Sequence, residues 1–557
     1  MELTPTAFVP KPIRIVVIGA GISGIQFLKD VTTRLPNVNI TVYDKNSQEG
    51  GTWAENRYPG CACDIPSHAY QYSWNPNPRW SRLYAEAAEI LDYLKSTVTK
   101  FDLRRYIQFG TTCTGANWDE KNSEWNVFLQ SNGNTNNEIS VKCDVFVVAV
   151  GRLNNWKLPD IDGLDTFQGR VIHTANWPQG LDYHGKDVAV IGNGASSTQC
   201  LASLRKDARS ISNFVRGPTW LVPHVFSSNG EPQVNCQHYL PYTQARTTSD
   251  RRTDSHDTIK KFETEPDSYL QFRLKIEKKL AYSFRGLWAN SSAAREFTQN
   301  AKQHMANKIN DRQTLKALLP TKYKAGCRRF TPADKYLEAL DQSNVELVST
   351  PIKQVEGNAI ITTDNKRRTY DIIVCGTGFE PYAPRFPIKG SGTANLSELW
   401  STDGGYESYL AATVAGFPNF FAKVIFQVFN PPICPVNGSA YPGIERTSDY
   451  IIRVIDRLQK DRLRSVCVKK SAQDAFNRWV QSRMPEMVWS EPCSSWYKSN
   501  EKVIVPWPGT ILHYYAATEI VRWEDYDLKF EEDDQKFASF GNGITVEGFT
   551  PQSIPWL

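Results

Sequence analysis

Short runs of apolar residues that end in glycine mark three places along an otherwise mixed chain. They cover residues 13–18, 188–191 and 371–375. Runs of Val and Ile of this length are typical of strands buried in a parallel sheet. The first two runs lead into stretches with the apolar spacing of a helix, so the pattern predicts two strand–helix units and an α/β fold.

The first apolar run leads into a glycine-rich turn, Gly19-Ala-Gly21-Ile-Ser-Gly24. In a dinucleotide-binding fold these glycines allow a tight turn, a close approach of the backbone to a pyrophosphate, and close packing of helix on strand. The helix N-terminus then faces the phosphates with its partial positive charge. A second strand-like run ends at Asp44, 25 residues after Gly19, where an acid can accept hydrogen bonds from a ribose 2′-hydroxyl. Together these features predict a site for a dinucleotide with an unphosphorylated ribose, such as FAD.

The second apolar run leads into Gly192-Asn-Gly194-Ala-Ser-Ser197, with serine in the place of the third glycine. The next strand-like run ends at Arg216, 24 residues after Gly192. An acid at this place would repel a 2′-phosphate, whereas arginine can bind it through two hydrogen bonds. Alone, Arg216 could equally be an ordinary surface residue, but with Gly192 and Gly194 it predicts an NADPH site. Two dinucleotide folds of opposite ribose preference indicate a flavoprotein that NADPH reduces.

Between about residues 225 and 320 the chain changes to helical spacing. Residues 270–284 and 293–319 repeat apolar positions at helical intervals, and the second stretch stops at Pro320. We therefore interpret this region as a helical insertion in the second of two Rossmann-like domains. The predicted segments are 1–160 and 351–557 for the FAD-binding domain with a C-terminal segment, 161–225 and 321–350 for the NADP-binding domain, and 226–320 for the insertion.

Composition and charge exclude several other classes of protein. Of the 557 residues, 40% are hydrophobic and 22% charged, which excludes disorder for the bulk of the chain. A net charge of +5 is too small to indicate a nucleic-acid-binding protein. The 11 cysteines contain no CxxC pair, so we expect neither a metal site nor a disulfide framework. This cysteine usage fits a protein of a reducing compartment. The sequence has no visible secretory signal or membrane-spanning run, and we expect a cytoplasmic protein.

Residues 167–178 match the pattern FxGxxxHTxxWP. That pattern is the signature of type I Baeyer–Villiger monooxygenases, which are class B flavoprotein monooxygenases that contain FAD and depend on NADPH. Residues 50–64 resemble the second signature of this family, residues 376–378 resemble its later FAD-domain turn, and residues 489–514 are similar to its fungal branch. The specified residues of the first signature are Phe167, Gly169, His173, Thr174, Trp177 and Pro178.

The resemblance implies a function in secondary metabolism. Members of the family insert one atom of O₂ next to a ketone carbonyl through a flavin C4a-peroxide, giving an ester or lactone. A fairly large apolar ketone is the implied substrate. Two alternatives remain: a flavin monooxygenase that oxygenates nitrogen or sulfur or hydroxylates carbon, and a non-catalytic nucleotide-binding protein. The signature together with Arg329 favours oxygen insertion next to a ketone. Soft nucleophiles such as amines and sulfides would instead need a protonated, electrophilic peroxide.

The resemblance also implies the site residues. Arg329 falls on the active-site arginine of the family and Asp64 on the acid that pairs with it, although a purely structural ion pair is the alternative. A guanidinium suits the task because it is always charged and donates several hydrogen bonds to developing oxyanions. His173 lies between the nucleotide domains and is expected to organise domain motion. The residues implied at FAD are Gly51, Thr52, Trp53, Asp64, Ile65 and Tyr70. The residues implied at NADP are Ala62, Cys63, Thr198, Gly217, Arg328 and Trp496.

One segment departs from the family pattern. In relatives, a Phe-Pro-Asn sequence like that at 417–419 runs through a short strand into a Gly-Pro loop near the flavin. Here residues 417–439 are several residues longer and lack the Gly-Pro pair. The longer segment could reshape the substrate pocket, accompany a related flavin chemistry, or simply extend an apolar strand and loop.

Overall fold

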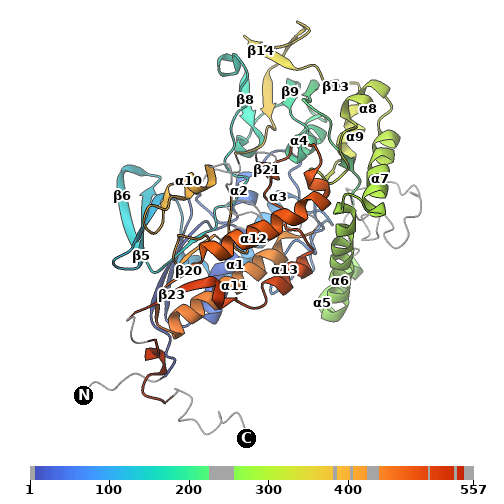
Figure 1. Cartoon of the computed structure of the whole chain (residues 1–557). Helices are drawn as coiled ribbons and strands as arrows, with labels where there is room; N and C mark the ends of the chain where they lie inside the picture. The colour runs from blue at the N-terminus through green and yellow to red at the C-terminus, as the bar shows by residue number, and fades with distance from the viewer. Residues whose placement is uncertain are drawn as a thin grey trace.

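The protein is described by a computed structural model that covers residues 7–224, 256–380, 385–401, 406–422, 438–499, 502–531 and 536–544. Helices α5 to α9 stand on one flank of the molecule, and strands β5 and β6 stand on the opposite flank (Figure 1). Two parallel sheets lie between these flanks, which confirms the predicted α/β class.

The first sheet has the strand order β19-β7-β1-β2-β3 and is parallel throughout. Its central strands are apolar because both faces are buried: helices pack on one face, and the antiparallel strands β4 (Thr111–Asp119) and β5 (Glu124–Ser131) pack on the other. The strands are β1 (Ile13–Ile18), β2 (Val38–Tyr43), β3 (Ile107–Gln108), β7 (Val145–Val148) and β19 (Phe420–Ala422). The helices α1 (Ile22–Arg34) and α11 (Ala440–Lys460) pack on each other, and α2 (Thr52–Glu55) and α3 (Ala87–Lys100) complete this region.

The second sheet has the order β13-β10-β9-β17-β8 and is also parallel throughout. Helix α4 (Ala195–Leu204) follows β9, and α9 (Asp334–Leu340) packs against α4. The strands are β8 (Arg170–His173), β9 (Asp187–Ile191), β10 (Ser210–Phe214), β13 (Val345–Val348) and β17 (Ile372–Cys375).

The position of β17 corrects the predicted boundary at residue 351. The sequence analysis placed residues 351–557, with the turn at 376–378, in the FAD-binding domain. Strand β17 (residues 372–375) instead pairs with β8 and β9 and belongs to the second sheet, whereas β19 at residues 420–422 lies in the first sheet as predicted. A buried Val/Ile run followed by a glycine turn looks the same in either sheet, because its partners are set by tertiary packing and not by its own sequence.

Among the described residues, four α-helices lie between the short paired strands β11 (Leu221–Val222) and β12 (Thr331–Pro332). They are α5 (His256–Thr264), α6 (Pro266–Tyr282), α7 (Ser292–Lys308) and α8 (Arg312–Leu318). Their starts follow from local chemistry: the side chains of Ser291 and Asp311 cap α7 and α8, and Pro266 begins α6. Residues 226–255 of the predicted insertion lie outside the described residues.

Smaller sheets and a C-terminal unit surround this core. In the C-terminal unit, helix α11 packs on strand β20, and helix α13 packs on α11. The peripheral strands are β4 (Thr111–Asp119), β5 (Glu124–Ser131), β6 (Asn134–Cys143), β18 (Ile388–Lys389), β14 (Ile352–Glu356), β15 (Ala359–Thr362) and β16 (Arg367–Thr369). The C-terminal elements are β20 (Leu463–Val468), α12 (Lys470–Arg483), β21 (Lys498–Ser499), β22 (Lys502–Val503), α13 (Ile511–Ala517) and β23 (Tyr526–Phe530), and α10 (Leu396–Ser401) precedes them.

Only the two ends of the unusually long segment at 417–439 lie among the described residues. Its first part forms β19, which pairs with β7, but residues 423–437 lie outside the described residues. Within the part of the chain that the structure describes, no helix is both long and apolar enough to cross a membrane.

Candidate active site

The first glycine-rich turn is closed by backbone contacts that leave no room for side chains. A β-carbon added to Gly24 would lie 1.9 Å from the carbonyl oxygen of Gly19, so α1 begins directly against the end of β1. Gly51, in the next loop, approaches Gly21 so closely that its added β-carbon would lie 3.0 Å from the Gly21 Cα. Gly21 remains partly exposed at the start of α1, where a pyrophosphate would meet the backbone amides.

Asp44 has a structural role in addition to its predicted role as a hydrogen-bond acceptor for the ribose. Its carboxylate accepts a hydrogen bond from the amide of Ala20 at 2.6 Å and from the amide of Asn46 at 2.7 Å. The residue is only 5% exposed, and burial raises the pKa of its carboxyl group. The predicted ribose acceptor therefore also holds the glycine-rich turn in shape.

The second turn shows how serine replaces the third glycine. Ser197 is buried, and its hydroxyl donates to the carbonyl oxygen of Gly376 at 3.2 Å, which ties α4 to the turn after β17. Thr198 donates to the carbonyl of Ala195 within its own helix. Gly194 is the N-cap of α4, so this helix has no side-chain cap, and it has no acidic residue in its first turn.

Two arginines lie at or against the residues that follow β10. Arg216 is exposed just after the strand, and Gly217 follows it. Arg328 comes from a distant segment, and its Nη1 donates to the Thr219 hydroxyl at 3.3 Å while its guanidinium lies over the ring of Tyr323. The Nε of Arg328 is buried and has no hydrogen-bond partner among the described residues. A phosphate group would suit this arrangement of donors.

The residues present therefore fit both dinucleotides. Helices α1 and α4 each start at a glycine with no side-chain cap and no acidic residue in the first turn, which leaves their amides for phosphate oxygens. The carboxylate of Asp44 follows β2, as an unphosphorylated ribose requires, and the positively charged Arg216 follows β10, as a ribose with a 2′-phosphate requires.

Arg329 and Asp64 form a two-point ion pair across the two nucleotide folds. Nη2 of Arg329 lies 2.8 Å from Oδ1 of Asp64, and its Nε donates to Oδ2 at 3.1 Å. The side chains are 26% and 21% exposed, so the pair is sheltered but not sealed. Paired carboxylate oxygens fix the plane of a guanidinium, and such a fixed cation can stabilise a developing oxyanion.

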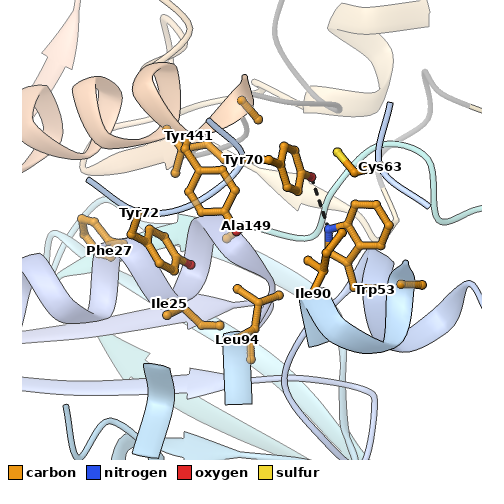
Figure 2. Close-up of a cluster of buried hydrophobic side chains, with 14 of the residues drawn as sticks. Ile25, Phe27, Trp53, Cys63, Tyr70, Tyr72, Ile90, Leu94, Ala149 and Tyr441 are labelled. Carbon is orange, nitrogen blue, oxygen red and sulfur yellow. Dashed lines mark hydrogen bonds between the residues drawn. The ribbon is translucent and has the colours of Figure 1, made fainter. Parts of the chain in front are cut away.

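Two residues of the implied cofactor sites, Cys63 and Tyr70, lie within electrostatic reach of this pair. The indole Nε1 of Trp53 donates to the hydroxyl oxygen of Tyr70 at 3.2 Å, and the two rings meet edge to face (Figure 2). Thr52 starts α2, and the amide of Ile65 lies 3.4 Å from the Cys63 sulfur. Burial raises the pKa of the Cys63 thiol well above its usual range, which keeps it uncharged.

Gln199 is a connecting residue that the sequence analysis did not single out. It lies on α4, and its amide group donates to the carbonyl oxygen of Ala62 at 3.1 Å and accepts from the Tyr58 hydroxyl at 2.8 Å. The second nucleotide fold is thus fastened to the loop that leads to Asp64. A glutamine two residues beyond Ser197 carries no sequence signal of this role.

Trp496 is half-buried in the C-terminal segment. The guanidinium of Arg152 lies 5.2 Å from the centre of its ring, and Tyr497 packs against it at 4.5 Å. Arg152 follows β7, at the point where the chain leaves the first sheet. This contact places Trp496, which the resemblance implies at the nicotinamide cofactor, at the connection between the two domains.

A disulfide bond links the arginine segment to the tryptophan segment, contrary to the expectation of reduced cysteines. Cys327 directly precedes Arg328, and it is bonded to Cys493, which is three residues before Trp496. The partners are 166 residues apart, so spacing in the sequence could not have indicated their pairing. Lys324 and Glu491 form an ion pair beside the bond.

Replacing Cys493 by serine should destabilise the folded protein. Removing a cross-link that closes so long a loop should lower the free energy of unfolding by about 2–5 kcal/mol, because the unfolded chain gains freedom. Urea unfolding with and without dithiothreitol measures the change. Reductant should shift the wild type to the midpoint of Cys493→Ser and leave that variant unchanged. A titration that finds all 11 thiols free in the native protein would contradict the bond.

His173 is buried in an aromatic stack. Its ring lies flat on Trp156 at 5.2 Å and edge-on to Phe379, and its Nδ1 accepts from the amide of Ala175. Burial lowers the pKa of His173 to about 4. An uncharged, stacked ring fits an organising role better than acid–base chemistry at neutral pH.

The rest of this signature lies on both faces of the second sheet. Phe167 packs in the core on one face, and Trp177 packs against the larger core that both sheets share. A side chain at Gly169 would collide with the carbonyl oxygen of Asp371 at 2.3 Å. Pro178 is exposed.

Comparisons with known proteins agree on one group of enzymes. Residues 12–238 match the flavin-binding monooxygenase-like family. The FAD-binding monooxygenase moxY of Dothistroma septosporum is 36% identical over 96% of this chain and 83% of its own length. A Baeyer–Villiger monooxygenase of Streptomyces coelicolor is 30% identical over 93% of this chain and 92% of its own.

Solved structures show the same architecture. The crystal structure of cyclohexanone monooxygenase from Rhodococcus sp. Phi1 bound to NADP⁺ matches with a TM-score of 0.77 and 25% identity, covering 94% of this chain and 100% of that one. An oxidized steroid monooxygenase bound to NADP matches with a TM-score of 0.76 and 26% identity, covering 93% of this chain and 99% of that one.

Proposed function

Because this chain belongs to the flavin-binding monooxygenase-like family and is a flavin-dependent monooxygenase, we propose that it is a Baeyer–Villiger enzyme. It binds FAD and NADPH and inserts one oxygen atom of O₂ between the carbonyl carbon and a neighbouring carbon of a ketone. The product is an ester or a lactone, and the second oxygen atom leaves as water.

The observation that carries this proposal is the Arg329–Asp64 pair. It stands where the segment before β12 meets the loop after α2, and it is joined there by Nη2···Oδ1 and Nε···Oδ2 contacts of 2.8 and 3.1 Å. A fixed positive charge between a flavin site and a nicotinamide site is the feature that attack on a carbonyl requires, because negative charge develops on oxygen during the reaction. Oxygenation of a sulfide or an amine develops no such charge on a substrate oxygen.

The two nucleotide folds would hold the cofactors. The turn from Gly19 to Gly24 and the carboxylate of Asp44 bind FAD, and the turn from Gly192 to Ser197 binds NADPH. Arg216 and Arg328 read the 2′-phosphate of NADPH. When bound, FAD reduced by NADPH supplies activated oxygen for the reaction.

The chain's own residues then shape the chemistry. Arg329 stabilises negative charge on the reacting oxygen atoms and orients the ketone carbonyl. Asp64 keeps the guanidinium in place, and because their side chains are only about a quarter exposed, water screens the charge weakly. Trp496 covers the nicotinamide side of the site and is held there by Arg152.

We propose an apolar ketone as the substrate. Trp53 and Tyr70 supply mostly apolar, aromatic side chains (Figure 2), and Tyr70 lies within electrostatic reach of Asp64 and Arg329. Two relatives are named as a Baeyer–Villiger monooxygenase and a cyclohexanone monooxygenase, which supports the ketone class.

A product screen tests this function. The purified protein, NADPH and O₂ are incubated with a panel of cyclic and open-chain ketones, alkyl aryl sulfides and tertiary amines, and products are identified by mass. We expect an added mass of one oxygen in ketone products, with fragments of an ester or lactone. Sulfoxides or N-oxides formed while every ketone stays unchanged would contradict the proposal.

A further inference from the structure

Tyr441 is a buried tyrosine at the start of helix α11 that none of the predicted roles includes. It is 1% exposed. Its ring meets Tyr70 edge to face at 5.0 Å and Tyr72 edge to face at 4.7 Å, and Figure 2 shows it between these two side chains. Two segments far apart in the sequence, the loop at residues 70–72 and the start of α11, therefore meet at this ring.

The hydroxyl group of Tyr441 differs from those of its neighbours. The Tyr70 hydroxyl oxygen accepts a hydrogen bond from Trp53, and the Tyr72 hydroxyl donates to the carbonyl oxygen of Ile22 at 2.8 Å. The Tyr441 hydroxyl is buried with no hydrogen-bond partner among the described residues. Such a group costs free energy unless another state of the protein supplies a partner, so it calls for an explanation.

The surroundings of this hydroxyl belong to the first nucleotide fold. Figure 2 shows Tyr441 over Ala149, with Trp53 and Cys63 on the far side of Tyr70. Ala149 follows β7, and its carbonyl oxygen is the atom that a β-carbon on Gly19 would strike at 2.5 Å. Tyr72, whose ring contacts Tyr441, donates to the carbonyl oxygen of Ile22 in the glycine-rich turn, so Tyr441 is one side chain away from that turn.

The charge state of Tyr441 defines what it can bind. Burial raises the pKa of its hydroxyl well above the usual range, with smaller contributions from the nearby tyrosines Tyr72, Tyr93 and Tyr70 and from Cys63. It is therefore a neutral donor throughout the physiological range. Oxygen atoms and ring nitrogens of a flavin nucleotide are acceptors for such a group.

We propose that Tyr441 is a further FAD-binding residue, whose hydroxyl donates a hydrogen bond to the bound flavin nucleotide. This inference rests on the proposed function, since it requires FAD at the first nucleotide fold. It also explains why α11, a helix of the C-terminal segment, is packed into the first fold: its first turn completes the cofactor site. FAD binding would then tie the C-terminal segment to the N-terminal sheet.

The test is Tyr441→Phe in the full-length holoenzyme, which removes only the hydroxyl oxygen. FAD release on dilution is followed by flavin fluorescence, and thermal unfolding is measured with and without excess FAD. We expect the dissociation constant of FAD to rise by about three- to tenfold, the usual effect of losing one hydrogen bond. The FAD-free variant should unfold at the same or a higher temperature than the wild type, because an unsatisfied group has been removed.

Tyr450→Phe is the matched control on the same helix. Its hydroxyl is also fully buried but is bonded to Tyr526 at 2.8 Å. This variant should unfold at a lower temperature without FAD and keep the wild-type dissociation constant. The proposal thus predicts opposite results for the two variants: Tyr441→Phe loses FAD affinity but not stability without FAD, and Tyr450→Phe loses stability but not FAD affinity.

Each outcome decides the inference. If Tyr441→Phe binds FAD with a dissociation constant within twofold of the wild type, the proposed role of Tyr441 is overturned. The proposed function would still stand in that case, because the wild type binds FAD. A lower unfolding temperature of the FAD-free variant overturns that role as well, since the hydroxyl would then have a partner inside the protein. A wild type that binds no FAD would refute the proposed function and the inference together.

Discussion

Replacing Arg329 by alanine should slow oxygen insertion by about a hundredfold to a thousandfold and thereby lower the yield of oxygenated product per NADPH. The variant should still bind FAD, because the turn at Gly19–Gly24 and the carboxylate of Asp44 are untouched. NADPH oxidation should continue, more slowly if the same guanidinium helps to seat the nicotinamide. The electrons should appear in hydrogen peroxide instead of product.

The reason lies in the geometry of the Arg329–Asp64 pair. Two contacts of 2.8 and 3.1 Å hold the guanidinium in a fixed plane before the substrate arrives, so its charge needs no rearrangement as the oxyanion develops. Alanine removes the charge and the donors together and leaves Asp64 without this partner. Removal of one preorganised donor in other enzymes has an effect of this size, and a full charge is worth at least as much.

The measurement compares product, hydrogen peroxide and NADPH consumed in the same reaction. Arg329→Lys is the matched control, because it keeps a positive charge but loses the planar fork, and it should fall between wild type and alanine variant. Near wild-type product per NADPH in Arg329→Ala would mean that the pair is only structural. If Arg329→Ala loses FAD, the lysine variant carries the comparison.

Replacing Arg216 by alanine should reduce the preference for NADPH over NADH by about tenfold to a hundredfold. Arg216 is exposed at the carboxyl end of β10, where the ribose of a bound dinucleotide lies in such folds. Loss of a charged hydrogen bond costs about 1.5–3 kcal/mol, and the loss applies to NADPH alone because NADH has no 2′-phosphate. Arg328, held beside Thr219, should preserve part of the preference.

The measurement is the rate of flavin reduction over a range of NADPH and NADH concentrations. Arg209→Ala is a suitable control, because Arg209 stands just before the opposite end of β10 and is ion-paired with Asp187. It should leave the ratio unchanged. If Arg216→Ala also leaves the ratio unchanged, Arg216 does not read the phosphate.

Local patterns predicted the two nucleotide folds because their determinants are local. A buried apolar strand, a glycine turn and a charged residue about 25 positions later are all set within one strand–helix–strand unit. The comparisons confirm the family inferred from residues 167–178. The assignment of β17 to the first domain was wrong for the complementary reason, since its partners β8 and β9 lie far away in the sequence.

The features that the sequence did not reveal all depend on contacts between distant segments. The Cys327–Cys493 bond joins residues 166 positions apart, and neither cysteine belongs to a recognisable motif. The bridging amide of Gln199 and the unpartnered hydroxyl of Tyr441 are visible only when neighbouring atoms are known. The Arg329–Asp64 pair was predicted from the resemblance alone, and the structure brings the two side chains together.

The central claim is that this enzyme inserts oxygen beside a ketone carbonyl. The most direct test is turnover of a ketone accepted in the product screen under ¹⁸O₂, followed by mass spectrometry of the product and its fragments. The account predicts one heavy oxygen atom in the single-bonded ester position, an unlabelled carbonyl oxygen, and one product formed per NADPH consumed. A heavy oxygen in a hydroxyl group or in the carbonyl group of the product would contradict it.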